Sequence, residues 1–335
     1  MRNAHGLEQP NYFDEVEFEV EARRVFDICH GCRRCFSLCH SFPTLFDAVD
    51  ESETGELDSV SKKAYWDVVE HCYLCDMCYM TMCPYVPPHE WNVDFPHLML
   101  RAKAKAFQDG RPSWRDKVLS ATDTLGSLAG IPVVAQTINA VNRSRSGRRL
   151  LQQTLGVHAE APVPAYHSNP ARRRLRQKVG RRDADAVSAG GTKGRVLIFA
   201  TCYGNRNQPG LVEDLNDVFE HNGIPTALAE KERCCGMPKL ELGDLETVER
   251  YKNDNIEELH EWVEGGWDII APIPSCVLMF KQELPLLFPD DEKVAAVAAG
   301  FFDPFEYLML RHKVGRLDTN FRNTLGKVAY QVPCH

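Results

Sequence analysis

The sequence predicts an α+β protein in which a helical module is followed by an α/β domain with a mainly parallel sheet. Eight of the 13 cysteines lie in two tight runs near the N-terminus, and apolar residues at helical spacing precede each run. Beyond residue 192, short apolar runs alternate with longer amphipathic segments. Strands that alternate with helices in this way favour a parallel sheet.

Three helices are expected in the N-terminal module. Apolar residues at helical spacing occur in residues 11–28 and 61–71. Each segment is therefore expected to form a helix that leads into the cysteine run after it. Residues 97–108 are rich in good helix formers and predict a third helix. Prolines interrupt the chain between the second cysteine run and this helix. We therefore expect a helical domain at residues 1–110.

The two cysteine runs have nearly the same spacing. They are Cys29-x2-Cys32-x2-Cys35-x3-Cys39 and Cys72-x2-Cys75-x2-Cys78-x4-Cys83. In two-cluster ferredoxins, three close thiolates of such a run bind one cubane [4Fe–4S] cluster and the fourth binds the other. On that pattern one cluster is assigned to Cys29, Cys32, Cys35 and Cys83. The other is assigned to Cys39, Cys72, Cys75 and Cys78.

Two other chemistries compete with iron at these cysteines. Structural zinc usually takes two separated cysteine or histidine pairs, a pattern that two four-member runs fit poorly. Disulfides are typical of secreted chains, and the first residues lack the basic and apolar regions of a signal peptide. The runs depart from the ferredoxin pattern at His40, where proline is usual, and in the longer gap before Cys83.

Residues 111–192 are expected to join the two domains. The amphipathic stretch at 112–157 predicts helices that pack in the core or dock on another subunit. Residues 162–192, rich in Pro, Arg, Gly and Ser, predict a linker with a solvated basic run. The formal charge of −8 argues against nucleic acid as a partner. No apolar run reaches the ~20 residues needed to cross a bilayer.

The α/β domain is expected at residues 193–335. Short apolar runs predict strands at 196–200, 226–229, 269–273 and 327–332. Amphipathic segments predict helices at 211–221, 244–264, 277–287 and 304–311.

The remaining five cysteines follow the predicted strands. They are Cys202, Cys234, Cys235, Cys276 and Cys334. Because the carboxyl ends of parallel strands face one crevice, where ligands bind, these thiols are expected to converge. The adjacent pair, followed by Gly236, suits an unusual cluster, a bridging ligand or a redox pair. Ser275 is the expected N-cap of the helix at 277–287, which would place Cys276 where thiolate is favoured.

The order of these motifs resembles a known family. Two ferredoxin-type runs followed by Cys202-x31-Cys234-Cys235-Gly236-x39-Cys276 resemble the iron–sulfur oxidoreductases that carry a cysteine-rich CCG domain. That family includes an iron–sulfur component of anaerobic glycerol-3-phosphate dehydrogenase and components of heterodisulfide reductase. The resemblance implies a helical ferredoxin-type module and a first CCG repeat at residues 193–335. It also implies a catalytic site at Cys202, Cys234, Cys235 and Cys276, with Cys334 as a further candidate metal ligand.

Two features depart from the family pattern. Met279 stands where the repeat often has a second cysteine, so a cluster at this site would lack that ligand. The final residues, 332–335, resemble the opening of the segment that leads into a second CCG repeat. We therefore expect a truncated sequence whose second repeat is missing.

The resulting hypothesis is an iron–sulfur oxidoreductase subunit. Two [4Fe–4S] clusters would carry electrons to or from the CCG site, which would exchange them with a disulfide, a quinone or a partner redox protein. An additional iron–sulfur cluster at the CCG site is an open option. No NAD or FAD motif is found, since Gly204 and Gly210 do not form G-x-G-x-x-G. A redox partner protein or flavoprotein subunit is therefore expected.

Two alternatives stay open. In one, the chain is a non-catalytic electron-transfer adaptor that docks a dehydrogenase at a membrane. In the other, Cys234 and Cys235 cycle as a metal-free thiol–disulfide switch. The expected location is the cytoplasm, with peripheral attachment to the cytoplasmic face of the membrane through a partner as a variant.

Overall fold

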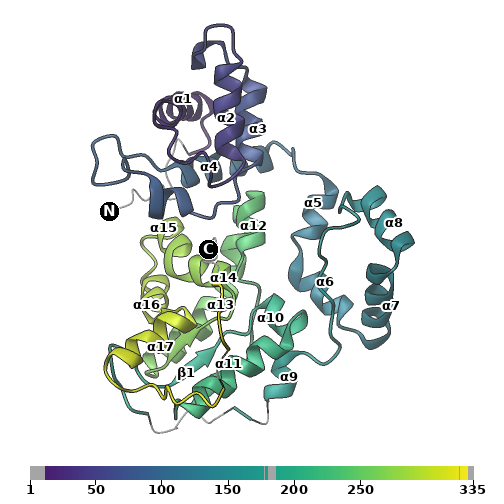
Figure 1. Ribbon diagram of the computed structural model, residues 1–335, viewed down its shortest axis with the longest axis vertical. Coiled ribbons are helices and arrows are strands. Elements are labelled where there is room, and N and C mark those ends of the chain that lie inside the picture. Colours follow the sequence, from purple (N-terminus) through teal and green to yellow (C-terminus); the bar gives the residue numbers. More distant parts are fainter. Residues whose placement is uncertain (1–11, 177, 180–185, 324, 331–335) are drawn as a thin grey trace.

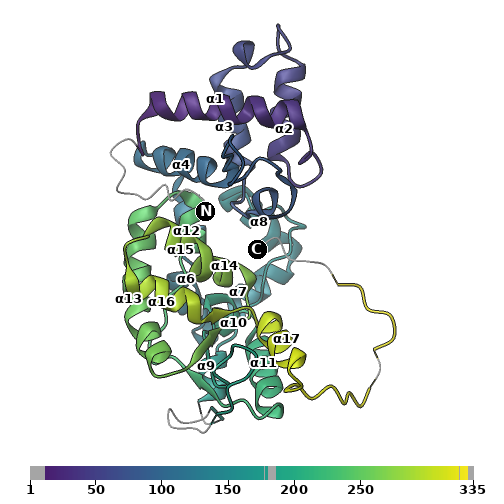
Figure 2. The same ribbon diagram turned by 90° about the vertical axis from the view of Figure 1, so that its left-hand side faces the viewer.

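The computed structural model describes residues 12–176, 178–179, 186–323 and 325–330. A helical module lies at one end of the long axis and an α/β domain at the other (Figure 1). An arm of short helices, residues 114–155, stands to one side of both. The segment that follows the last helix runs away from the body of the domain (Figure 2).

The described part of the N-terminal module is helical. It contains α1 (Glu15–Cys32), α2 (Ser41–Asp50), η1 (Leu57–Ser59), α3 (Lys62–Glu70), η2 (Cys78–Met82) and α4 (Phe95–Gln108). The side chains of Asp14, Ser61 and Asp94 accept backbone N–H groups and so cap α1, α3 and α4. The three predicted helices are confirmed, although α1 is displaced toward Cys32. Helix α2 was not predicted.

The arm consists of short helices separated by breaks. They are α5 (Trp114–Leu119), α6 (Thr122–Ala129), α7 (Pro132–Arg143) and α8 (Arg145–Leu155). Proline begins α7 because its fixed φ suits the first helical turn. No single described helix is long and apolar enough to cross a membrane. The bent pair α6 and α7, with an angle of 104° between them, meets the same criteria of length and composition when taken together.

Part of the predicted linker is a packed helix. Helix α9 (Ala171–Leu175) buries both of its terminal residues in a core shared with α11 (Pro209–His221). Two of its arginines are paired with carboxylates, Arg172 with Glu232 at 2.8 Å and Arg174 with Glu213 at 2.9 Å. The expectation of a solvated run is therefore wrong here, because two apolar residues four apart share one helix face and fill the core.

The α/β domain contains a small parallel sheet. Its strands within the described residues are β1 (Val196–Ile198), β2 (Thr226–Leu228), β3 (Asp268–Ile270) and β4 (Phe301–Phe302), in the order β2-β1-β3-β4. In register, Leu197 lies opposite Ala227 on one side and Ile269 on the other. The predicted α+β class with a mainly parallel sheet is confirmed.

Helices alternate with these strands. They are α10 (Cys202–Arg206), α11, α12 (Met237–Leu242), α13 (Leu245–Glu264), α14 (Pro274–Leu278), η3 (Met279–Glu283), α15 (Leu284–Leu287), α16 (Glu292–Gly300) and α17 (Pro304–Lys313). The helices predicted at 211–221, 244–264 and 304–311 are confirmed. The one predicted at 277–287 is a continuous run of α14, η3 and α15. Helices α10, α12 and α16 were not predicted.

The predicted last strand is wrong where the structure describes it. Residues 327–330 form no strand, and the fourth strand is Phe301–Phe302 instead. Phe301 is fully buried and stacks on Phe280 at 4.8 Å between ring centroids, whereas Val328 and Tyr330 are exposed. The sheet edge is thus completed by the segment that brings apolar area into the core. Residues 331–335, with Cys334, lie outside the described part of the chain.

One hydrophobic core connects the helical module to the α/β domain. It includes Phe26 and Met99 from the module and Phe199 and Phe280 from the domain. Helix α4 packs on α12, which follows the vicinal cysteines directly. The structure thereby holds the N-terminal cysteines in a fixed relation to the strand-end cysteines.

Candidate functional site

Four N-terminal cysteines line one cavity. They are Cys29, Cys32, Cys35 and Cys83, and they form the first cysteine group. Helix α1 ends at Cys32, and Arg33 closes it in the left-handed conformation, φ 54°, so that the chain turns back toward Cys35. Cys83 arrives from the second run. The set is the one assigned to the first cluster by the ferredoxin pattern.

A π-turn explains the longer gap in the second run. The backbone N–H of Cys83 donates to the carbonyl of Cys78 at 2.8 Å, which closes η2 over five residues. The extra residue is absorbed by this wider turn. Cys83 therefore still reaches the first cysteine group.

The other four N-terminal cysteines form the second cysteine group, which consists of Cys39, Cys72, Cys75 and Cys78. The charge of Cys72 would interact with those of Cys39 and Cys75, and the charge of Cys78 with those of Cys72 and Cys75. Cys35 also lies within interaction range of Cys78, so the two groups adjoin.

The strand-end cysteines converge into a row. Cys202 begins α10 after β1, Cys234 and Cys235 precede α12 after β2, and Cys276 lies in α14 after β3. The sulfurs of Cys202 and Cys234 are 3.9 Å apart. Hydrogen bonds continue the row from Cys234 to Cys235 and from Cys235 to Cys276. We call these four residues the cysteine row.

The backbone at two turns gives the row its shape. Gly236, directly after the vicinal pair, has φ 102°, a conformation that residues with a Cβ rarely adopt. Thr201, before Cys202, also has positive φ, at 64°, and its hydroxyl accepts the N–H of Gly204 at 2.9 Å. Thr201 is buried, so a non-glycine residue in this conformation marks a strained turn directly before Cys202.

Helix α6 of the arm reaches into the row, a contact that was not predicted. The hydroxyl of Thr122 donates to Cys234 Sγ at 3.3 Å, and Asp123 Oδ2 accepts the N–H of Cys234 at 2.8 Å. From the other side, Asn255 Nδ2 donates to the carbonyl of Cys234 at 3.2 Å. More than 100 residues separate Cys234 from the arm, and no motif marks either contact.

Comparison with known proteins gives a family match for the part of the chain that holds the row. Residues 196–281, which contain the whole row, match the family described as the cysteine-rich domain, CCG. This part of the chain is therefore a cysteine-rich CCG domain. The chain is 30% identical over 249 residues to a component of anaerobic glycerol-3-phosphate dehydrogenase from Escherichia coli strain K12, a match that covers 73% of this chain and 59% of that protein.

More distant relatives match shorter stretches. Lactate utilization protein A of Bacillus cytotoxicus is 30% identical over 31% of this chain and 41% of its own length. Citrate utilization protein B of Escherichia coli is 29% identical over 28% of this chain and 22% of its own length. The chain thus spans less than two thirds of the curated relatives it matches. No solved structure matches it.

Hydrogen bonds set the charge state of the row in this CCG domain. Cys202, Cys235 and Thr122 all donate toward Cys234 Sγ, and these bonds outweigh burial and lower the pKa of Cys234. The same bonds, with burial and neighbouring thiol charge, raise the pKa of Cys202 and Cys235. In the metal-free row, the thiols beside Cys234 therefore favour its thiolate form.

Burial dominates at the N-terminal groups. It raises the pKa of Cys35 to about 11 and that of Cys72 to about 12, and it also raises the pKa of Cys29, Cys78 and Cys83. These thiols are protonated at neutral pH without a cation. Four thiols facing one apolar-walled cavity fit an iron–sulfur cluster, whose charge would hold them as thiolates.

Among the residues that the structure describes, no group of three or more His, Cys, Asp or Glu side chains is placed to hold a single metal ion. A cubane distributes its four thiolates over four irons. Its ligands consequently lie farther apart than those of one ion.

Ser275 and Met279 lie in the segment that carries Cys276. Ser275 is not an N-cap, which corrects the prediction: α14 begins at Pro274 with Ile273 as the cap, because proline suits the first turn, so Ser275 is already helical. Met279 is fully buried, and its Cε lies 3.4 Å from the point where a Cβ on Gly236 would stand. A thioether thus packs behind the vicinal pair at the position where the family often has a cysteine.

Proposed function

We propose that this chain is an electron-transfer subunit in which two [4Fe–4S] clusters exchange electrons with the cysteine row. The observation that carries the proposal is the grouping of eight N-terminal thiols into two adjoining sets of four, docked on the CCG domain through one core. Cys29, Cys32, Cys35 and Cys83 would hold one cluster. Cys39, Cys72, Cys75 and Cys78 would hold the other.

The clusters would supply one-electron carriers, and the protein would supply their positions and surroundings. Phe42 and Pro84 line the first cavity and exclude water from it. Cys35 and Cys78 belong to different groups and lie within interaction range, so electrons would pass between neighbouring clusters. At the row, the hydrogen bonds to Cys234 would stabilise a thiolate ligand or a thiolate nucleophile, and an additional cluster at Cys202, Cys234, Cys235 and Cys276 is part of the proposal.

We infer that a partner protein completes the redox reaction. A flavoprotein subunit would provide the hydride chemistry, since this sequence carries no nicotinamide or flavin motif. A disulfide, a quinone or a second redox protein would meet the row. The relative named as part of a dehydrogenase is consistent with a role inside a larger complex.

An anaerobic reductive titration of the full chain with dithionite tests this function. Each [4Fe–4S] cluster takes one electron, so two electrons should enter the N-terminal groups and further electrons should enter the row. Cys235→Ala should lose only the electrons of the row. Met279→Leu, which keeps every thiol, is the control. A wild-type chain that takes up no more electrons than Cys235→Ala would contradict a redox function for the row.

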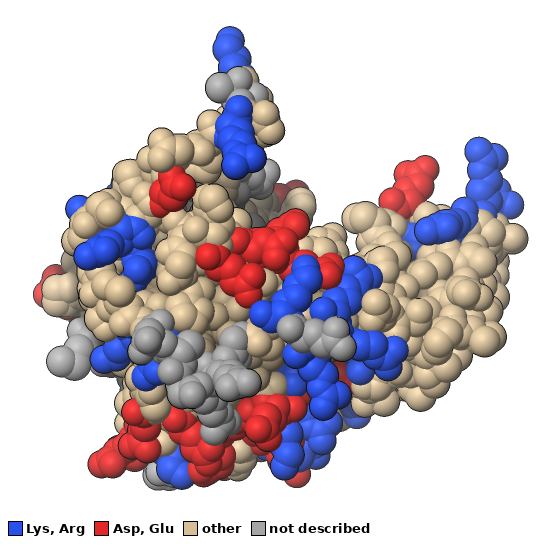
Figure 3. Space-filling view, turned by 90° about the horizontal axis from the view of Figure 1, so that it is seen from below, with Lys and Arg blue, Asp and Glu red and all other residues tan. Residues whose placement is uncertain are grey.

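A membrane-docking adaptor is the second candidate, because one surface favours it. Residues 124–142, across α6 and α7, contain no charged side chain, and Leu128, Ile131 and Val133 are 49–72% exposed. Seen from below, the arm is largely uncharged, and basic side chains gather between it and the α/β domain (Figure 3). Apolar residues beside basic ones favour the surface of an anionic bilayer.

Sedimentation with vesicles that contain anionic lipid tests the adaptor. Val133→Asp should reduce binding, and Val314→Asp, a change at a similarly exposed valine outside the arm, should not. Equal binding of the two variants would exclude attachment through α7.

A third candidate is the metal-free switch at Cys234 and Cys235, which is supported by the side-chain hydrogen bond between them and by the lowered pKa of Cys234. It predicts that the iron-free chain forms a reversible disulfide within the row under mild oxidation. Mass spectrometry that finds only free thiols in the row would contradict it.

A further inference from the structure

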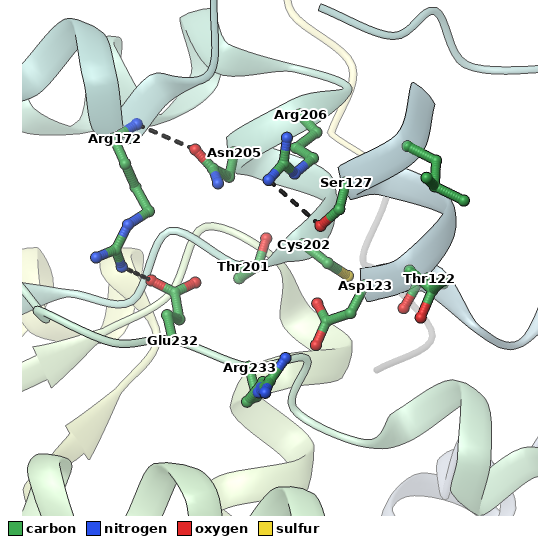
Figure 4. A pocket seen from close by; sticks show the side chains of 12 residues that line it. Thr122, Asp123, Ser127, Arg172, Thr201, Cys202, Asn205, Arg206, Glu232 and Arg233 are labelled. Atoms are coloured by element: carbon green, nitrogen blue, oxygen red, sulfur yellow. Dashed lines mark hydrogen bonds and ion pairs between the residues drawn. The ribbon is translucent and has the colours of Figure 1, made fainter. Parts of the chain in front are cut away.

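A cavity of about 340 Å³ opens beside Cys202. Helix α6, helix α9, helix α10 and the loop before α12 contribute its walls, so its lining comes from segments far apart in the sequence (Figure 4). This volume lies within the range of small-molecule sites. Cys202 is the member of the cysteine row that lines it.

Three guanidinium groups surround the cavity. Arg172 pairs with Glu232 at 2.8 Å, and Arg233 pairs with Asp254 at 3.4 Å. Arg206 has no carboxylate within ion-pair distance among the described residues, and its guanidinium reaches only the hydroxyl of Ser127, at 3.5 Å. Figure 4 shows Arg206 and Arg172 on opposite sides of the space in front of Thr201.

The carboxylates of the lining already have protein partners. Glu232 accepts bonds from Arg172 and from the N–H of Ala200, at 3.1 Å. Asp123 accepts the N–H of Cys234. Asp123 interacts with the charge of Arg206 only at a range longer than an ion pair. The guanidinium of Arg206 therefore has N–H donors that no described carboxylate accepts, and a ligand could accept them.

Gly126 in α6 and Gly130, which directly follows the helix, make room for this arginine. A Cβ at Gly126 would stand 3.0 Å from the Arg206 side chain, and one at Gly130 would stand 2.5 Å from its Nη1. Both glycines have ordinary helical φ, so backbone conformation does not require them. They lie four residues apart on one helix face, and the guanidinium occupies the space above them.

We propose that this cavity binds a small organic anion through the guanidinium of Arg206. A guanidinium presents paired N–H donors that match a carboxylate or a phosphate group, and hydroxyls of Thr122, Thr201 and Ser127 line the same space. The bound anion lies next to Cys202. The anion would be a substrate of the row only if the proposed function is correct. Binding of the anion does not require a cluster.

Calorimetry with inorganic phosphate and, separately, malonate tests the proposal on the full chain purified anaerobically. The wild type should bind one equivalent of at least one probe at low ionic strength. Arg206→Gln should weaken that binding by at least about tenfold, because a charge-assisted hydrogen bond is lost. Arg145→Gln, which removes the same charge from the exposed start of α8, should leave the affinity unchanged.

A second pair of variants tests position rather than charge. Gly130→Ala should displace the guanidinium and weaken binding although every charge is retained. Gly210→Ala, at a glycine whose Cβ would meet no atom within 4 Å, should bind normally. Binding of malonate but not phosphate assigns a carboxylate ligand, and the reverse assigns a phosphate ligand.

Absence of binding by both probes would overturn the proposal, as would equal affinities of wild type and Arg206→Gln. The same samples are analysed for iron. A chain that binds the anion but holds no iron would support the anion site and contradict the proposed function. A chain that holds iron but binds neither probe would contradict the anion site and leave the proposed function standing.

Discussion

The N-terminal cysteines and the cysteine row use the same side chain in different surroundings. Among the eight N-terminal thiols, burial raises the pKa of five. In the row, donors converge on Cys234 and lower its pKa. The first arrangement suits groups that hold a buried cofactor. The second suits a group that keeps a negative charge available for chemistry.

The two regions also differ in the number of chain segments that contribute residues to each site. Each N-terminal group needs two short runs, whereas the row combines three strand ends with Thr122 and Asp123 from the arm. A single substitution should therefore affect different segments of the chain in the two regions.

The largest expected effect is loss of a cluster across the two runs. Cys83→Ser should damage the cluster held by Cys29, Cys32 and Cys35, because its thiol lines their cavity. Cys39→Ser should damage the cluster of the second run. Paramagnetic resonance of the reduced variants distinguishes the two signals. If each change instead disturbed only the cluster of its own run, the crossed assignment would be wrong.

Cys235→Ala separates the regions most cleanly. Turnover with the physiological acceptor should be abolished, while the N-terminal clusters stay reducible by dithionite. Removing one thiol leaves the core largely intact, since Gly236 and α12 keep their packing. Unchanged turnover would mean that the row is only a set of small buried residues.

His97 should show how strongly the two regions are held together. It is buried between Asp94, at 3.3 Å, and Glu283 of the α/β domain, at 3.0 Å. Burial opposes its charge, but these two carboxylates prevail and raise its pKa from 6.5 to about 9. The difference corresponds to about 3 kcal/mol. This contribution is complete below pH 6.5 and is lost as the pH rises through about 9.

The iron-loaded wild type should therefore lose unfolding free energy between about pH 7 and about pH 9.5, to a degree that His97→Gln does not show. His221→Gln changes an exposed histidine and should behave like the wild type. Chemical unfolding under anaerobic conditions gives the three curves. Parallel pH profiles for His97→Gln and the wild type would show that this contact contributes no pH-dependent stability.

The smallest expected effect is at Thr122. Thr122→Val keeps the shape of the side chain but removes the hydroxyl that donates to Cys234 Sγ. In the iron-free chain the pKa of Cys234 should rise, which the pH dependence of its alkylation measures. Ser127→Ala removes a hydroxyl from the same helix for which no bond to the row is found among the described residues, and should have no effect. An unaltered alkylation profile in Thr122→Val would show that the hydroxyl of Thr122 does not influence the pKa of Cys234.

Local spacing explains why some features could be predicted from the sequence. The cysteine runs, the helices that deliver them and the parallel strands depend on nearby residues. Convergence of Cys202, Cys234 and Cys276 followed from the rule that parallel strand ends share a crevice. The contact of Thr122 with Cys234 and the pairing of Arg172 with Glu232 depend on long-range packing, and no local pattern encodes them. The missed strand at 301–302 is too short to show a period.

Two [4Fe–4S] clusters at the eight N-terminal thiols are the basis of the proposed electron transfer. Iron and sulfide analysis of the full chain, purified anaerobically and combined with paramagnetic resonance, is the decisive measurement. We expect about eight irons for the two N-terminal groups, in addition to any iron at the row, and two interacting cubane signals on reduction. Stoichiometric zinc with no iron after reconstitution would contradict the assignment of clusters to these thiols.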